Sequence, residues 1–106
     1  MYESHIFLDF EMNPIPRTCR EAREIARAEI VEIGAVRLDK DYQLVDRYSR
    51  FVKPQYGPIQ RHITELTGIT DADVAEAEPF EAAIAAFGAW MGGGHTRVYS
   101  WSRSDQ

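Results

Sequence analysis

Two acidic residues lie two positions apart near the start of the chain. The stretch HIFLDFEMNP, residues 5–14, runs through apolar residues to Asp9, then Phe10 and Glu11. On a strand the two acids point the same way, with Cα atoms about 6.5–7 Å apart. Paired carboxylates repel each other and lose hydration, and a divalent cation removes both costs. Hard oxygen ligands favour Mg²⁺ or Mn²⁺. The alternative is an exposed strand end whose acids pair with arginines.

The strands and helices that must position these acids can be predicted from the sequence. β-branched and apolar runs predict strands, and apolar residues at helical spacing predict helices. Gly68 is placed to end a helix, and the TDAD stretch at 70–73 has the pattern of a capping box. The predicted order is strands at 5–11, 29–39 and 43–54, helices at 58–68 and 79–94, and a strand at 96–102, with a short helical or irregular stretch at 18–29.

The connections between these elements predict a mixed α/β sheet. Short loops join the first three strands, which is typical of antiparallel neighbours, and the more polar third strand is expected near an edge. The crossover through the helices returns the fourth strand parallel to the first. The helix at 79–94 begins at Pro79 and carries an apolar stripe that should face the sheet, formed by Phe80, Ala83, Ile84, Phe87 and Met91.

Composition limits the classes of function. The chain has 106 residues, 44% of them hydrophobic, which predicts one globular domain. With 17 acidic and 12 basic residues its net charge is −5, so if the chain binds nucleic acid, a local source of positive charge such as a metal ion must attract the phosphates. The single Cys19 forms no internal disulfide, which suits a reducing compartment. No segment is long and apolar enough for a membrane span or a signal peptide, so we expect a cytoplasmic protein with no membrane partner.

Five segments, taken in order, resemble the DEDD (DnaQ-like) family of 3′-5′ exonucleases, which have the ribonuclease H-like fold. An apolar strand ending in D-x-E is similar to the first exonuclease motif of that family, and a strand delivering Asp105 is similar to the second. The resemblance covers nearly the whole chain. Its segments are FLDFEMNP, IVEIGAVRLD, FVKP, ELTGIT followed by DADVAEAEPF, and VYSWSRSDQ.

The resemblance implies a metal-dependent hydrolase that cuts phosphodiester bonds at the 3′ end of single-stranded RNA or DNA. Asp9 would bridge two metal ions, Glu11 would hold one, and Asp105 would complete the acidic cluster, so all three are the predicted catalytic and metal-binding residues. The cofactor is Mg²⁺ or Mn²⁺ in a two-metal site, with the ions about 3.5–4 Å apart. Four further residues are assigned to substrate binding: Phe10, Leu66, Thr67 and Ile69. Strand alternation also favours a core position for Phe10.

The chain departs from the family pattern after Asp105. The family has a third motif there, with a last metal-binding Asp and a His or Tyr general base, whereas this sequence ends at Gln106. All three histidines precede the second motif, so none matches the base by order. We therefore expect the N-terminal part of an exonuclease domain, without the last strand and helix, which is inactive or nearly so by itself. The sheet edge or face left uncovered would suit a homodimer.

Several alternatives stay open. Glu32 is predicted to share a strand side with Ile30 and Gly34, from which its carboxylate could approach the two acids. A solvated or ion-paired side chain is the simpler interpretation. Trp90 and Tyr99 are aromatic candidates for base stacking, although core packing is favoured for both. For the chain as a whole, the main alternative is a non-catalytic nucleic-acid- or protein-binding module on the same fold. A phosphatase with an Asp nucleophile fits less well, because such enzymes typically carry D-x-D.

Overall fold

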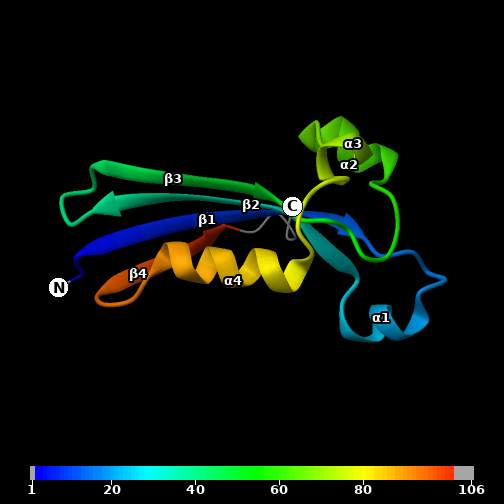
Figure 1. Ribbon diagram of the computed structural model, residues 1–106, viewed down its shortest axis with the longest axis horizontal. Helices are drawn as coiled ribbons and strands as arrows, with labels where there is room; N and C mark the ends of the chain where they lie inside the picture. Colours follow the sequence, from blue (N-terminus) through cyan, green and yellow to red (C-terminus); the bar gives the residue numbers. More distant parts are fainter. Residues whose placement is uncertain (1, 102–106) are drawn as a thin grey trace.

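The computed structural model describes residues 2–101, which form one four-stranded sheet with helices on both faces (Figure 1). The strand order is β3-β2-β1-β4. The first three strands are antiparallel, β4 lies parallel to β1, and β3 is at an edge, which confirms the predicted topology. The strands are β1 (Ser4–Pro14), β2 (Ala28–Asp39), β3 (Leu44–Phe51) and β4 (Thr96–Trp101).

Four helices connect the strands where the sequence signals place them. Gly68 ends α2 in the left-handed conformation at φ 82°, as predicted, because a residue without a Cβ carries no steric penalty there. The predicted capping box is also confirmed: the Thr70 hydroxyl accepts from the Asp73 N–H, and the Asp73 carboxylate accepts from the Thr70 N–H. The helices are α1 (Arg20–Ile25), α2 (Arg61–Thr67), α3 (Asp71–Val74) and α4 (Phe80–Met91).

One face of the sheet packs against α4 (Figure 1). Side chains at alternate positions of β1 and β2 meet the helix there, and burying them supplies about 25 cal/mol for each Å² of apolar surface removed from water. The predicted stripe of α4 is narrower than expected, because Phe80 and Ile84 remain 44% and 37% exposed. The buried members of this cluster are Ile6, Leu8, Ile33, Ala35, Val52, Ala83 and Phe87.

The opposite face is covered only at one end, by α2 and α3 (Figure 1). Its buried cluster consists of Val31, Ile59, Ile63, Ile69 and Val74. Val31 and Ile33 belong to different clusters although they are two residues apart, because the β1–β2 register shifts between Glu11 and Met12, with Glu11 opposite Glu32 and Met12 opposite Ile30. Such a bulge inserts one extra residue and reverses the faces beyond it. The expectation that Ile30 shares a side with Glu32 is therefore wrong: Ile30 packs against the α4 cluster.

Candidate active site

Asp9 and Glu11 lie on the sheet face opposite α4. Their neighbours Leu8 and Phe10 contact the α4 cluster, so the alternation of the strand turns both acids to the other side, as predicted. Both carboxylates are partly exposed.

The strand register arranges this face in rows that cross the sheet. The Glu11 row continues through Glu32 on β2 to Phe51 on β3, which packs against the α2–α3 cluster. The Asp9 row continues through Gly34 on β2 to Ser49 on β3. Because Gly34 has no side chain, β2 places no side chain beside Asp9 in this row.

The carboxyl group of Glu32 has a raised pKa. Burial raises the pKa of the Glu32 carboxyl, the Ser49 hydroxyl that donates to Glu32 Oε2 at 3.4 Å lowers it, and the carboxylates of Glu11, Asp9 and Asp73 raise it further. Glu32 forms no ion pair with another described residue and its side chain is partly exposed, so of the two predicted alternatives the structure shows the solvated side chain. Glu32 thus lies on the same face as the two acids, directly opposite Glu11 in the β1–β2 pair.

The described residues contain no group of three or more His, Cys, Asp or Glu side chains placed to hold a metal ion. Asp105, the third predicted ligand, lies outside the described residues. Within the described residues the candidate site therefore consists of Asp9 and Glu11 on β1, with Glu32 directly opposite Glu11 on β2.

The four residues assigned to substrate binding lie in different environments, and their role stays a prediction. Phe10 packs against the α4 cluster on the face opposite the acids, as its alternation suggested, and Ile69 is 3% exposed within the α2–α3 cluster. Leu66 is 66% exposed. The Thr67 hydroxyl donates to the Ile63 carbonyl at 2.8 Å and accepts from the Ile69 N–H at 3.1 Å. Of the four, Leu66 has the most surface available to a ligand.

Asn13 is a positioning residue that the sequence did not reveal. Its side chain is fully buried two residues beyond Glu11; Nδ2 donates to the Pro58 carbonyl at 3.0 Å, and Oδ1 accepts from the Gln60 N–H at 2.8 Å. These bonds tie the strand that carries the acids to the start of α2. The predicted strand ended at residue 11, which left no reason to expect a buried amide at position 13, whereas β1 continues to Pro14.

Tyr99 is also placed differently from the prediction. It belongs to neither core cluster; instead its ring stacks on Phe7 from β1, with centroids 4.3 Å apart and ring planes 6° from parallel. Trp90, by contrast, packs against the α4 cluster as predicted, and its Nε1 donates to Asp46 at 2.9 Å. The stacked pair lies on the face of Asp9, because Phe7 precedes Asp9 by two positions on β1.

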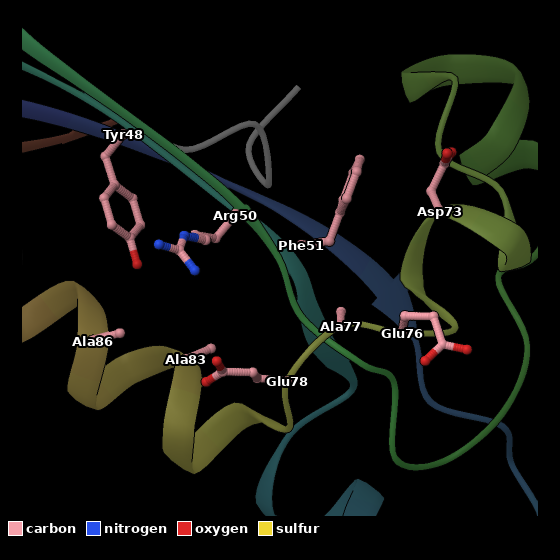
Figure 2. A pocket seen from close by; sticks show the side chains of 9 residues that line it. All are labelled: Tyr48, Arg50, Phe51, Asp73, Glu76, Ala77, Glu78, Ala83 and Ala86. Atoms are coloured by element: carbon pink, nitrogen blue, oxygen red, sulfur yellow. The ribbon is translucent and has the colours of Figure 1, made fainter.

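A separate pocket of about 310 Å³ lies between β3, α3 and α4 (Figure 2). The Arg50 guanidinium lies 5.7 Å from the centroid of the Tyr48 ring there. Three carboxylates are also among the lining groups, those of Asp73, Glu76 and Glu78. Figure 2 shows Tyr48 and Arg50 directed toward α4, away from the side to which Phe51 points. Neither Asp9 nor Glu11 lines this pocket, so it is distinct from the candidate active site.

Comparison with known proteins agrees with this geometry. A sequence model of the RNase T-type exonuclease family matches residues 6–100. ERI1 exoribonuclease 2 of Danio rerio is 33% identical over 88 residues, which are 81% of this chain and 15% of that protein. DNA polymerase III PolC-type of Caldanaerobacter subterraneus subsp. tengcongensis is 44% identical over 59 residues, 56% of this chain and 4% of that protein. The chain thus spans a small part of the curated relatives it matches.

Solved structures match the fold. A full-length 3′-exonuclease superposes with a TM-score of 0.78 at 21% identity, covering 98% of this chain and 36% of that one. E. coli exonuclease I in complex with a dT13 oligonucleotide superposes with a TM-score of 0.68 at 20% identity, covering 93% of this chain and 20% of that one. The mixed sheet with β4 parallel to β1 and two acids on β1 is the ribonuclease H-like exonuclease fold. The chain belongs to the DEDD exonuclease family. That family generally depends on divalent metal ions.

Among the residues that the structure describes, no helix is long and apolar enough to cross a membrane.

Proposed function

We propose that the chain is the N-terminal part of a metal-dependent 3′-5′ exonuclease domain that acts on single-stranded RNA or DNA. The observation that carries the proposal is the placement of Asp9 and Glu11 on one partly open sheet face, beside the gap left by Gly34. Family membership supports hydrolysis of phosphodiester bonds. The 3′ direction is supported by the relatives' names, which include 3′-exonucleases and exoribonucleases.

The donor set fits a hard divalent cation. Asp9 and Glu11 lie on one face of β1 and offer only oxygen ligands, which Mg²⁺ and Mn²⁺ prefer. Asp9, Glu11 and, by the family pattern, Asp105 would hold Mg²⁺ or Mn²⁺. When bound, such ions lower the pKa of a coordinated water and stabilise charge on the leaving oxygen.

The remaining task of these residues is to position the substrate. Gly34 leaves space for the scissile phosphate next to Asp9, and the link from Asn13 to Gln60 fixes α2 beside the strand that carries the acids. The exposed Leu66 near the end of α2 is available to a nucleotide. The names of relatives mention both RNA and DNA ligands, a histone mRNA stem-loop and a dT13 oligonucleotide, so either polymer is a candidate substrate.

The general base belongs to the third motif of the family, and general-base catalysis typically contributes ~10²–10⁴-fold in rate. We therefore expect the 106-residue chain to cut at least 10²-fold more slowly than a longer chain that adds a His and an Asp after Asp105. The lone Cys19 suits a reducing compartment such as the cytoplasm.

The test is a 5′-labelled single-stranded oligonucleotide incubated with both chains in Mn²⁺, with products resolved by gel. We expect a 3′-shortening ladder from the longer chain that Asp9→Ala abolishes and that a 3′-phosphate block delays. A ladder from the 106-residue chain that Asp9→Ala abolishes would show that the third motif is dispensable. Binding without cutting by the longer chain, in Mg²⁺ and in Mn²⁺, would support the non-catalytic module instead.

A further inference from the structure

The outer side of β3 is a free sheet edge, at the opposite end of the strand order from β4 (Figure 1). The third motif that we expect after Asp105 continues from β4 and packs over the acids on β1. The β3 edge is three strand spacings from β4, about 14 Å. Among the described residues, Glu78 covers the outer side of β3 only at its end, through a parallel bridge to Val52 and a hydrogen bond from the Lys53 N–H. Residues 46–50 therefore form a free edge for reasons unrelated to where the sequence ends.

The main-chain groups of β3 alternate between β2 and the free side. The Val52 N–H donates to a carbonyl of β2 at 2.8 Å, whereas the next N–H, that of Lys53, bonds on the outer side. The register of β3 on β2 has no shift from there back to Asp46, so the same alternation turns the N–H and carbonyl groups of Arg47 and Ser49 outward. The Arg47 N–H accordingly bonds to a side-chain oxygen, Oδ1 of Asp46, at 2.8 Å.

The side chains along this edge carry opposite charges at matching positions. The Asp46 carboxylate accepts from Trp90 Nε1 of α4 at 2.9 Å, and Figure 2 shows Tyr48 and Arg50 directed toward the same helix. Arg50 is exposed and forms no ion pair with another described residue. Charged residues on an edge strand usually oppose pairing with another chain. Here an acid and a base stand two residues to either side of Tyr48, and a two-fold axis at Tyr48 makes that arrangement self-complementary.

We propose that the β3 edge pairs antiparallel with the β3 edge of a second copy of this chain, with Tyr48 of each copy opposite Tyr48 of the other. In this register Arg47 and Ser49 of the two copies exchange main-chain hydrogen bonds, twice in the dimer. Asp46 of each copy lies directly opposite Arg50 of the other. These charged pairs fall at positions without main-chain hydrogen bonds, where opposed side chains are closest. The two four-stranded sheets join into one continuous sheet, with both acid-bearing faces on the same side.

Other registers of the same two edges are less favourable. Because the outward groups belong to alternate residues, the pairing shifts only in steps of two. One shift places Arg47 opposite Arg47, and like charges directly opposed are destabilising. The other places Asp46 opposite Val52, whose outer side is already bridged by the α3–α4 connection. The contact of five residues on each copy is smaller than a standard stable interface, so we expect a dissociation constant of about 10⁻⁵–10⁻³ M.

Charge reversal with rescue tests the contact. Sedimentation velocity in EDTA measures the monomer–dimer equilibrium of the 106-residue chain up to a concentration of about 1 mM. Asp46→Arg and Arg50→Asp each place like charges opposite one another at both charged pairs, so either variant alone should weaken dimerisation about tenfold or more. An equal mixture of the two variants should dimerise as the unmodified chain does, because an acid then faces a base in both pairs. Arg50→Asp leaves the bond between Asp46 and Trp90 in place, which keeps the test independent of that bond.

Variants of Ser49 test the main-chain hydrogen bonds. Ser49→Pro removes an outward N–H that β2 does not use, and an edge strand tolerates proline at such a position, so the chain should fold but stay monomeric. Ser49→Ala removes the hydroxyl that bonds to Glu32 but keeps the N–H, so it should dimerise normally. Arg61→Asp reverses the charge of a 93% exposed side chain on α2 and should leave the equilibrium unchanged. Circular dichroism checks the fold of every variant.

Two results would overturn this dimer. One is an unmodified chain that stays monomeric up to about 1 mM. The other is self-association that neither charge reversal weakens, or that the mixture of folded variants does not restore, which would assign the contact to another surface such as the free side of β4. The proposal does not rest on the exonuclease function, whose failure is seen separately as the absence of Asp9-dependent cutting by the longer chain.

Discussion

Gly34 lies directly opposite Asp9 in the antiparallel β1–β2 pair, so the catalytic candidate has no side chain beside it on the neighbouring strand. A Cβ added at Gly34 would lie 3.7 Å from the Asp9 carbonyl oxygen, which is ordinary van der Waals contact. The open space is therefore not required by packing of the sheet. It is consistent with room kept for a phosphate and its cation.

Filling that space should impair the site but not the fold. We predict that Gly34→Leu lowers the affinity for Mn²⁺ and for a single-stranded oligonucleotide by about tenfold or more, because its side chain would occupy the space beside Asp9, while Gly34→Ala changes both by less than about threefold. Calorimetry measures the metal and fluorescence anisotropy the oligonucleotide, with circular dichroism as the folding control. Equal losses in both variants would point to the backbone of β2 rather than to the space.

Metal binding should depend on Asp9. In calorimetric titration with Mn²⁺ we expect a weak binding heat from the chain, and Asp9→Ala should abolish it because one of the two same-face ligands is lost. Asp41→Ala is the control: this residue lies in the exposed β2–β3 turn, where its backbone N–H donates to Asp39, and the substitution leaves that bond in place. Equal heats from Asp9→Ala and the unmodified chain would contradict the site.

Asn13 should matter for the attachment of α2. Asn13→Ala leaves the Gln60 N–H and the Pro58 carbonyl without their buried partner, and one such unsatisfied group costs about 1–3 kcal/mol. For a domain of this size we expect a fall in Tm of about 5–15 °C. Hydrogen exchange should show faster exchange at the Gln60 amide.

Two controls sharpen the Asn13 prediction. Asn13→Asp retains an oxygen acceptor for the Gln60 N–H but buries a carboxylate against the Pro58 carbonyl, so at pH 7 it should lose at least as much stability as Asn13→Ala. Gln60→Ala removes only the side chain, whose Nε2 donates to Pro14 at 3.4 Å, and should change little. If all three variants melt together, the amide is not what holds α2 to β1.

The sequence predicted the framework of this site but not its local rearrangements. Periodicity and β-branched residues located all four strands, and the connections fixed the parallel pairing of β4 with β1. The bulge at Val31 has no sequence signature, since it depends on how two strands pair, and it moved Ile30 to the other face. Tyr99 was assigned to the core because aromatic residues usually are, whereas no helix of the described residues covers the face on which it stacks with Phe7.

Glu32 offers a test of the charge on this face in metal-free protein. Its carboxyl pKa is raised, by burial first and then by Glu11, Asp9 and Asp73. A carboxyl whose folded-state pKa lies above the unfolded value binds its proton more tightly in the folded state. Its charged form therefore costs stability above the folded pKa, and the cost disappears as the pH falls below the unfolded value.

We predict that Glu32→Gln raises the Tm of the EDTA-treated chain by about 1–4 °C at pH 7, a small gain because the group is partly exposed. The gain should shrink as the pH falls through the raised pKa toward pH 4, because Glu32 itself becomes neutral. Glu65→Gln is the matched control: it removes the surface ion pair with Arg61 and should not stabilise the chain at either pH. Thermal melts at both pH values measure the difference. A gain from Glu32→Gln that is equal at pH 7 and pH 4 would mean that the pKa of the Glu32 carboxyl is not raised in the folded chain.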